Sequence, residues 1–384
     1  MDRFLFAALS AIRQWTLAAA LTLLAACAAP PDAGPATAGA SPGEQLQRLA
    51  QRHQICAAAV AVIRQRQLQS VTTASGCSPA LAVRPDSVFQ AASLGKPVFA
   101  YAVLKLVREG RLALDAPVLQ YLPQGYRHAF DPLQPGLDGR TDEVTDPRLR
   151  SVTVRMLLQH TAGFANWARG PLRFDTEPGA RWAYSGEGYV LLQRAVEAVT
   201  GQPLDELMRE QVFTPLGMTH SSYRWTHEIA ERLLPGTKAN GAPRKTLALR
   251  QPVAAFSLYT SVEDYARFLV ALLNDPALSA QIADAPVEVD PALNLAWGLG
   301  WGLEQAADGV HLWQWGNNPG YRAFAIASPG SGDALVMLSN SDGGLKMAAP
   351  LVRAVMPGEH PVLRSPFLSE GLWVTLCEAL RLCF

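Results

Sequence analysis

The sequence has no net charge and no strongly charged region. Its 384 residues include 33 Lys or Arg and 33 Asp or Glu, so the formal net charge is zero at pH 7. There is no basic field to attract nucleic acid and no acidic block that would form a solvating tail. Because 49% of the residues are hydrophobic, the chain can bury a substantial core, and its length suits one large domain or two joined lobes. We therefore expect a folded protein that does not bind nucleic acid.

Sequence motifs for metal or dinucleotide binding are also missing. The histidines show no His-Glu-x-x-His or comparable ligand spacing, so we expect no zinc site and no cofactor. Gly298, Gly300 and Gly302 alternate with apolar residues. That alternation favours a strand packed closely against its neighbours over a dinucleotide fingerprint. The seven histidines are His53, His128, His160, His220, His227, His311 and His360.

The apolar run near the N-terminus, Trp15–Ala26, is too short and too rich in alanine for a stable transmembrane helix of about 20 residues. It follows Arg3 and Arg13, as in an export signal. It ends in Leu24-Ala25-Ala26-Cys27, which resembles the lipobox at which bacterial lipoproteins are cleaved and acylated. We expect residues 1–26 to be a lipoprotein signal peptide.

Cys27 is then the expected site of lipidation, and the Ala-, Pro- and Gly-rich residues 27–43 form a flexible tether. Ala28 after the cysteine fits an outer-membrane lipoprotein that faces the periplasm of a Gram-negative cell. The membrane is thus an expected partner, through the lipid. An ordinary signal peptide, giving a soluble periplasmic or secreted protein, is the alternative.

Cysteine is scarce, with five residues in the chain. If Cys27 carries lipid, four remain, an even number suited to an oxidising compartment. Cys56 and Cys77 flank two β-rich runs joined by a polar turn, so a hairpin would place them nearly opposite each other as a disulfide candidate. Cys377 and Cys383 would be separated by roughly 9 Å on a continuous helix, so they can pair only if that helix breaks.

Hydrophobic periodicity predicts an α+β fold: one antiparallel sheet built from both chain ends and flanked by helices, with a mainly helical lobe inserted at about 111–255. A long surface loop is expected at 124–150. We expect a site in the cleft between sheet and lobe. The predicted helices are 43–53, 92–109, 152–160, 187–200, 203–212 and 261–274. The predicted strands are a hairpin at 56–75 and single strands at 297–303, 311–315, 321–327 and 334–339.

Only five lysines are present, and only Lys96 has a serine three residues before it, Ser93. At the start of a helix this spacing places both side chains on one face. Serine is a poor nucleophile until a neighbour accepts its proton, which a desolvated lysine can do once its pKa falls toward ~7–8. The backbone N–H of Ser93 could then form half of an oxyanion hole. The alternative is a serine near a helix cap and a solvated surface lysine.

Six segments, the first of which contains Ser93 and Lys96, appear in an order that resembles the serine β-lactamase-related family, which includes class C β-lactamases, D-alanyl-D-alanine carboxypeptidases and related esterases. The resemblance runs from about Glu44 to Val355 and implies a penicillin-binding-protein-like fold, with residues 44–357 as the hydrolase domain. Residues 358–384 are then a C-terminal extension. The matching segments are residues 89–96, 152–164, 178–192, 213–219, 255–268 and 297–303.

This resemblance implies roles for individual residues. Ser93 matches the nucleophile and Lys96 its proton acceptor. Tyr184 matches a tyrosine that exchanges protons with the serine and the leaving group, a task for which we expect Lys96 to depress its pKa. The third family element falls at Gln314-Trp315-Gly316, and the backbone N–H of Asn317 would be the second oxyanion donor.

The chain departs from the family at two positions of that site. Gly186 replaces an asparagine that usually contacts a substrate amide, and Gln314 replaces a cation that usually faces a substrate carboxylate. Acyl transfer can survive these changes, but they put efficient turnover of penicillins or of peptides ending in D-Ala in question. Nearby, we interpret Arg322 as a solvated strand-edge residue and Glu187 as the start of a helix. We interpret His160 as a structural hydrogen-bonding residue.

Together these features predict an exported, lipid-anchored serine hydrolase that forms an acyl-enzyme with an ester, a β-lactam or a cell-wall peptide. One alternative treats residues 91–95 as the nucleophile elbow of an α/β-hydrolase, although the parallel-sheet pattern is absent. Another is a family member that has lost turnover and serves as an envelope scaffold. Gly186 and Gln314 favour that scaffold, whereas the intact Ser93 and Lys96 oppose it.

Overall fold

A large antiparallel sheet organises the chain. The computed structural model describes residues 41–133, 140–168 and 170–368. The expected signal peptide, the lipidation site Cys27 and the pair Cys377 and Cys383 lie outside these residues. In the part of the chain that is described, no helix is both long and apolar enough to cross a membrane.

The sheet has eight strands in the order β2-β1-β12-β11-β10-β9-β8-β7, and every neighbouring pair is antiparallel. Next to the β2 edge, β1, which comes early in the described chain, pairs with β12, which comes late in it. The prediction of one antiparallel sheet built from both ends is therefore confirmed. The strands are β1 Ala58–Arg64, β2 Gln67–Ala74, β7 Val287–Asp290, β8 Leu295–Trp297, β9 Gly302–Ala306, β10 Gly309–Asn318, β11 Tyr321–Ser328 and β12 Asp333–Ser339.

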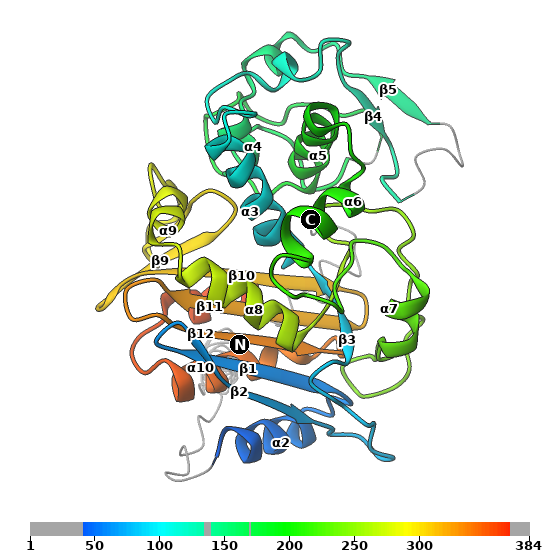
Figure 1. Ribbon diagram of the computed structural model, residues 1–384, viewed down its shortest axis with the longest axis vertical. Helices are drawn as coiled ribbons and strands as arrows, with labels where there is room; N and C mark the ends of the chain where they lie inside the picture. The colour runs from blue at the N-terminus through cyan, green and yellow to red at the C-terminus, as the bar shows by residue number, and fades with distance from the viewer. Residues whose placement is uncertain (1–40, 134–139, 169, 369–384) are drawn as a thin grey trace, which may run out of the picture. The chain divides into compact units, whose positions relative to one another are not determined.

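Both faces of this sheet are covered, as β1 shows. Alternate residues such as Ala59 and Ala61 belong to one hydrophobic core, and Val60 and Val62 belong to the other. This follows from the two-residue period of a strand. The helix α8 (Val262–Leu273) packs on the first face; α2 (Pro42–Arg52) and α10 (Ala348–Val355) pack on the opposite face (Figure 1). Because both sides are buried, β1 and β12 consist almost entirely of apolar residues.

Between β1–β2 and the later strands, the chain forms a mainly helical region with two small two-stranded sheets. The helices α3, α4 and α5 lie in the upper half of Figure 1, away from α2. The helices are α3 Gly95–Arg108, α4 Val154–Leu158, α5 Gly186–Thr200, α6 Leu204–Met208, α7 His227–Arg232 and α9 Pro276–Ile282. The small sheets pair β3 Val88–Ala92 with β6 Leu258–Ser261, and β4 Arg127–Ala129 with β5 Thr141–Glu143.

Short one-turn helices complete the described chain. The 3₁₀ turns η1 Val118–Gln120 and η2 Pro147–Ser151 lie in the helical region, and η4 Gly344–Met347 precedes α10. After α10 come η5 Pro361–Arg364 and η6 Pro366–Leu368. The described part of the expected C-terminal extension thus packs on the sheet, because Val362 and Leu368 belong to the core beneath α10.

Some boundaries differ from the prediction. The strand expected at 297–303 is two strands, β8 and β9, because Gly300 adopts a φ of +87° and lets the chain turn sharply. The helix expected at 203–212 consists of α6 and a π-helical turn at Arg209–Phe213. The expected loop at 124–150 contains the β4–β5 pair.

The disulfide between Cys56 and Cys77 is present, with the two Cα atoms 4.6 Å apart. Its position follows from the hairpin register, in which Ala58 of β1 lies opposite Ala74 of β2. The pairing predicted from the flanking runs is therefore confirmed.

Candidate active site

Ser93 lies in the tight connection between β3 and α3. All five residues of β3 are buried, and its last residue, Ala92, has a φ of +51°, which is unusual for a residue with a Cβ atom. The N–H of Lys96 donates to the carbonyl of Ser93 at 3.0 Å and closes the first turn. This turn holds Ser93 and Lys96 on one face at the start of the helix.

Lys96 is buried, with 1% of its surface exposed. Its Nζ lies 3.2 Å from Ser93 Oγ and donates to the carbonyl of Ala255 at 2.7 Å. Burial lowers the pKa of Lys96 to about 7. The alternative of a solvated surface lysine is therefore wrong, and a neutral amine suited to accept a proton lies beside the serine hydroxyl.

Tyr184 lies beside the same pair. Lys96 Nζ is 4.6 Å from the centre of the Tyr184 ring, and Gln314 Nε2 donates to Tyr184 Oη at 3.1 Å. Burial raises the pKa of Tyr184, although hydrogen bonds with the Ser93 and Gln314 side chains act in the opposite direction. The expected depression of this pKa is wrong. The physical reason is that burial of the phenol disfavours a phenolate more than these hydrogen bonds favour it.

The strand β10 forms the other side of the site. Gln314 is buried and also donates from Nε2 to the Ser93 carbonyl at 3.0 Å. A Cβ atom on Gly316 would overlap the carbonyl of Ala91, so only glycine lets the two backbones approach this closely. In the described strand pairs, β9 covers β10 only from Gly309 to Trp313. The part of β10 after Trp313, which includes the exposed Asn317, is not covered by β9 and faces the start of α3.

Gly186, at the first position of α5, lies under an indole ring. A Cβ atom at this position would overlap the ring of Trp167, which packs edge-on against Phe256 with centroids 5.3 Å apart. Phe256 directly follows Ala255, the residue whose carbonyl accepts the Lys96 hydrogen bond. Where the family usually has asparagine, this chain thus has glycine beside two packed aromatic rings, Trp167 and Phe256. No spacing in the sequence had indicated that these rings lie at the site.

A second aromatic group comes from the C-terminal segment. Phe367 stacks on Trp315 with ring centroids 4.9 Å apart, and Trp315 in turn lies 4.9 Å from Tyr184. Sequence reasoning did not connect Phe367 with the site, because the resemblance ends before this residue. Phe367, in the segment after α10, therefore packs against Trp315, the residue that follows Gln314 on β10.

Arg322 does not serve the site and is not solvated. It is 7% exposed and donates to the carbonyls of Asn318 and Tyr321, and its Nη1 lies 3.3 Å from Asp342 Oδ1. The interpretation as a solvated strand-edge residue is wrong, because the bend between β10 and β11 surrounds this side chain with acceptors.

Two other interpretations are confirmed. His160 Nδ1 accepts a hydrogen bond from the N–H of Ser185, so the ring has a structural partner next to Tyr184. Glu187 lies in the first turn of α5, where its Oε1 accepts from the N–H of Ala168 and its Oε2 lies 3.2 Å from His128 Nε2. Neither residue contacts Ser93 through these bonds.

Comparison with known proteins agrees with this geometry. A family model described as Beta-lactamase matches residues 44–356. The chain belongs to the Beta-lactamase family. It is 27% identical over 372 residues to Penicillin-binding protein 4 of Amycolatopsis lactamdurans, with 84% of this chain and 90% of that protein covered. It is 34% identical over 168 residues to Esterase EstB of Burkholderia gladioli, with 35% and 38% covered.

Solved structures confirm the fold of this family member. The D-alanine carboxypeptidase AmpC from Burkholderia cenocepacia superposes with a TM-score of 0.67 at 18% identity, covering 82% of this chain and 97% of that one. The family and the antiparallel sheet exclude the α/β-hydrolase alternative, which needs a parallel sheet. The protein is thus a serine hydrolase of the Beta-lactamase family with a penicillin-binding-protein-like fold.

Proposed function

We propose that Ser93 is the nucleophile of an acyl-transfer reaction and that neutral Lys96 is its base. The separation of 3.2 Å between Lys96 Nζ and Ser93 Oγ, together with the pKa of about 7 for Lys96, carries this proposal. As Lys96 accepts the hydroxyl proton, Ser93 Oγ bonds to the substrate carbonyl carbon. The backbone N–H groups of Ser93 and Asn317 stabilise the resulting oxyanion.

Tyr184 then delivers a proton to the leaving group. Its raised pKa keeps the phenol protonated, and the hydrogen bond from Gln314 to its oxygen leaves the phenolic hydrogen available. Collapse of the tetrahedral intermediate breaks the bond to the leaving group and leaves an acyl-Ser93 ester. Lys96 returns the proton it accepted to Tyr184 and is neutral again. It then accepts a proton from water as the water oxygen bonds to the acyl carbon, and Ser93 Oγ leaves and takes that proton back from Lys96.

We further propose that the substrate is a neutral carboxylic ester. At the strand position where relatives of the family carry a cation, Gln314 is neutral, and its Nε2 donates hydrogen bonds to the Ser93 carbonyl and to Tyr184 Oη. Trp167, Phe256 and Trp315 supply apolar surface around the site. These features suit an acyl or alcohol group without a carboxylate better than a penicillin or a peptide C-terminus. The partial match to an esterase supports the same class.

Labelling of Ser93 tests the proposal. We expect a fluorophosphonate to add its phosphonyl mass to the peptide that contains Ser93, and p-nitrophenyl butyrate to be hydrolysed with a burst. Ser93→Ala should abolish both signals, while Ser70→Ala, on the remote strand β2, should leave them unchanged. Penicillins and a D-Ala-D-Ala peptide, tested in parallel, should turn over far more slowly. Absence of both adduct and hydrolysis would favour the envelope scaffold without turnover.

The pH dependence of hydrolysis follows from Lys96. Because burial lowers its pKa to about 7, the base is protonated and inactive below this pH and neutral above it. We expect kcat/KM for a neutral ester to rise about tenfold per pH unit below pH 6 and to level off above pH 8. Stopped-flow or initial-rate measurements between pH 5 and pH 9 check this. A profile that stays flat to pH 5 would show that Lys96 is not the base.

We propose that the protein is exported and anchored by lipid on Cys27, at the outer membrane facing the periplasm. The lipobox-like Leu24-Ala25-Ala26-Cys27 supports this, as does the Cys56–Cys77 disulfide, which suits an oxidising compartment. Cys27→Ser should move the protein from the membrane fraction to the soluble fraction and abolish palmitate labelling. Ala28→Ser is the control and should remain anchored. A membrane-bound, unlabelled Cys27→Ser protein would contradict the proposal.

A further inference from the structure

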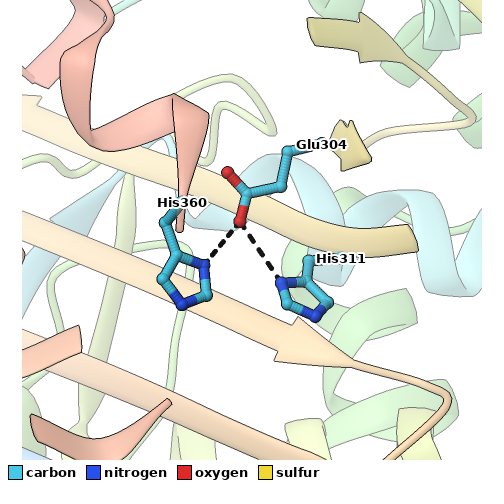
Figure 2. Close-up of side chains that lie close together, drawn as sticks. All are labelled: Glu304, His311 and His360. Carbon is cyan, nitrogen blue, oxygen red and sulfur yellow. Dashed lines mark hydrogen bonds and ion pairs between the residues drawn. The ribbon is translucent and has the colours of Figure 1, made fainter. Parts of the chain in front are cut away.

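Three buried side chains meet on the face of the sheet covered by the C-terminal segment. Glu304 on β9 lies directly opposite His311 on β10 in the strand register, and His360 follows α10, just before η5. Their exposed fractions are 1%, 2% and 6%. Figure 2 shows both imidazole rings turned toward the same carboxylate oxygen. Among the described residues, this is the group whose donors are arranged for a metal ion.

The donor atoms converge on one point. Glu304 Oε1 lies 2.7 Å from His360 Nδ1 and 3.2 Å from His311 Nδ1 (Figure 2). One candidate ligand atom from each residue lies within 4.8 Å of the others. Two imidazole nitrogens and one carboxylate oxygen at this spacing are the ligand types and number that a zinc-like ion takes from a protein.

The remaining polar atom of each side chain is held by a neighbour. His360 Nε2 lies 2.8 Å from the carbonyl of Met356, His311 Nε2 lies 2.9 Å from Asp308 Oδ1, and the N–H of Val362 donates to Glu304 Oε2 at 3.0 Å. Such outer contacts are the ones that orient metal ligands. A carbonyl can only accept, so Nε2 of His360 carries a hydrogen, and its Nδ1 presents a lone pair unless a second proton is added.

This arrangement favours a cation at the centre of the cluster. The lone pair of His360 Nδ1 faces a buried carboxylate oxygen 2.7 Å away, an unfavourable contact that a cation bound by both atoms relieves. A divalent ion uses all three donors at once.

We propose that Glu304, His311 and His360 bind one divalent transition-metal ion of the zinc class. The ion joins β9 and β10 to the segment after α10, which carries Phe367 against Trp315. It therefore stabilises the C-terminal segment and takes no part in the proposed reaction at Ser93. No ligand motif in the sequence indicates this site, because its residues meet only through the pairing of β9 with β10 and the return of the chain after α10.

Direct metal binding tests this site. Chelator-treated protein titrated with Zn²⁺ in a calorimeter should bind one ion per chain with micromolar or tighter affinity. Co²⁺ in its place should give the visible absorption bands of a low-coordinate nitrogen and oxygen site. An excess of about 100 times the dissociation constant should raise Tm by roughly 4 °C or more. Absence of both Zn²⁺ binding and the Co²⁺ bands would overturn the proposal and leave a proton-bridged cluster.

Variants locate the ion. His311→Gln and Glu304→Gln should each weaken Zn²⁺ binding at least tenfold, and near-ultraviolet circular dichroism shows whether each variant is folded. Because Co²⁺ absorption is measured on the unaltered protein, the test does not depend on any variant folding. His227→Gln is the matched control: this exposed histidine lies 3.1 Å from Glu231 on α7, where a surface ion could bind. Loss of the bound ion in the control alone would also overturn the proposal.

Discussion

Replacing Lys96 with methionine is expected to lower kcat/KM for a neutral ester about 10²–10⁴-fold, the usual contribution of a positioned base. Methionine is also unbranched and only one atom shorter than the buried lysine side chain, but it cannot accept the proton of Ser93. In the parent protein Lys96 Nζ lies 3.2 Å from Ser93 Oγ. In the variant this nitrogen is gone, so the serine hydroxyl remains but has no base beside it. Rate measurements with p-nitrophenyl butyrate at pH 8 check the loss.

The same variant should be more stable than the parent protein. Folding lowers the pKa of Lys96 from 10.5 to about 7. This shift lowers the parent's free energy of unfolding by about 3 kcal/mol at pH 8. The unfolded chain binds more protons between about pH 7 and pH 10.5, and the parent's free energy of unfolding therefore rises with pH across that window. The variant also loses the hydrogen bond from Lys96 to the Ala255 carbonyl. We therefore expect its free energy of unfolding to exceed that of the parent by about 1–2 kcal/mol at pH 8, and this difference to disappear near pH 10.

Two companion variants separate catalysis from packing. Lys105→Met, on the same helix, removes an amine that donates to the carbonyl of Gln211 and should leave kcat/KM unchanged. Lys96→Arg should be as inactive as Lys96→Met, because a guanidinium does not release its proton in this pH range. An active Lys96→Met protein that keeps its Ser93 label would contradict the assignment of the base.

The chemistry of the site was predictable where it depends on residues close in the chain. Ser93 and Lys96 occupy one helical turn, so their spacing alone predicts their contact. The sheet was predictable for a similar reason, since long apolar strands with turn residues between them favour antiparallel pairing. The Cys56–Cys77 disulfide followed from one hairpin. In each case the deciding interaction is local or is repeated along an element.

Contacts between distant segments could not be predicted in this way. Trp167, Phe256 and Phe367 reach the site from separate loops and from the C-terminal segment, and no periodicity links them to Ser93. The pKa of Tyr184 was wrongly predicted because it depends on how much water the surrounding rings exclude. Arg322 was misplaced because its partner Asp342 lies across a strand connection.

Gly186 should tolerate no side chain while Trp167 keeps its position. The first residue of α5 lies against the indole, and a Cβ atom would overlap the ring. We expect Gly186→Ala to lower the free energy of unfolding by about 1–3 kcal/mol, the range for overpacking, and kcat/KM about tenfold or more as the ring moves. Gly188→Ala is the control: its Cβ would meet Ser185 Oγ at 3.5 Å, an ordinary contact, so stability should stay level or rise slightly.

The double variant decides whether Trp167 is the cause. Gly186→Asn alone restores the residue expected from the family but should be destabilised like Gly186→Ala. Removing the ring with Trp167→Ala gives the asparagine room, so the double variant should lose less stability than the sum of the two single changes. Chemical denaturation of all four proteins measures this coupling. Strict additivity would show that the indole is incidental to the choice of glycine at position 186.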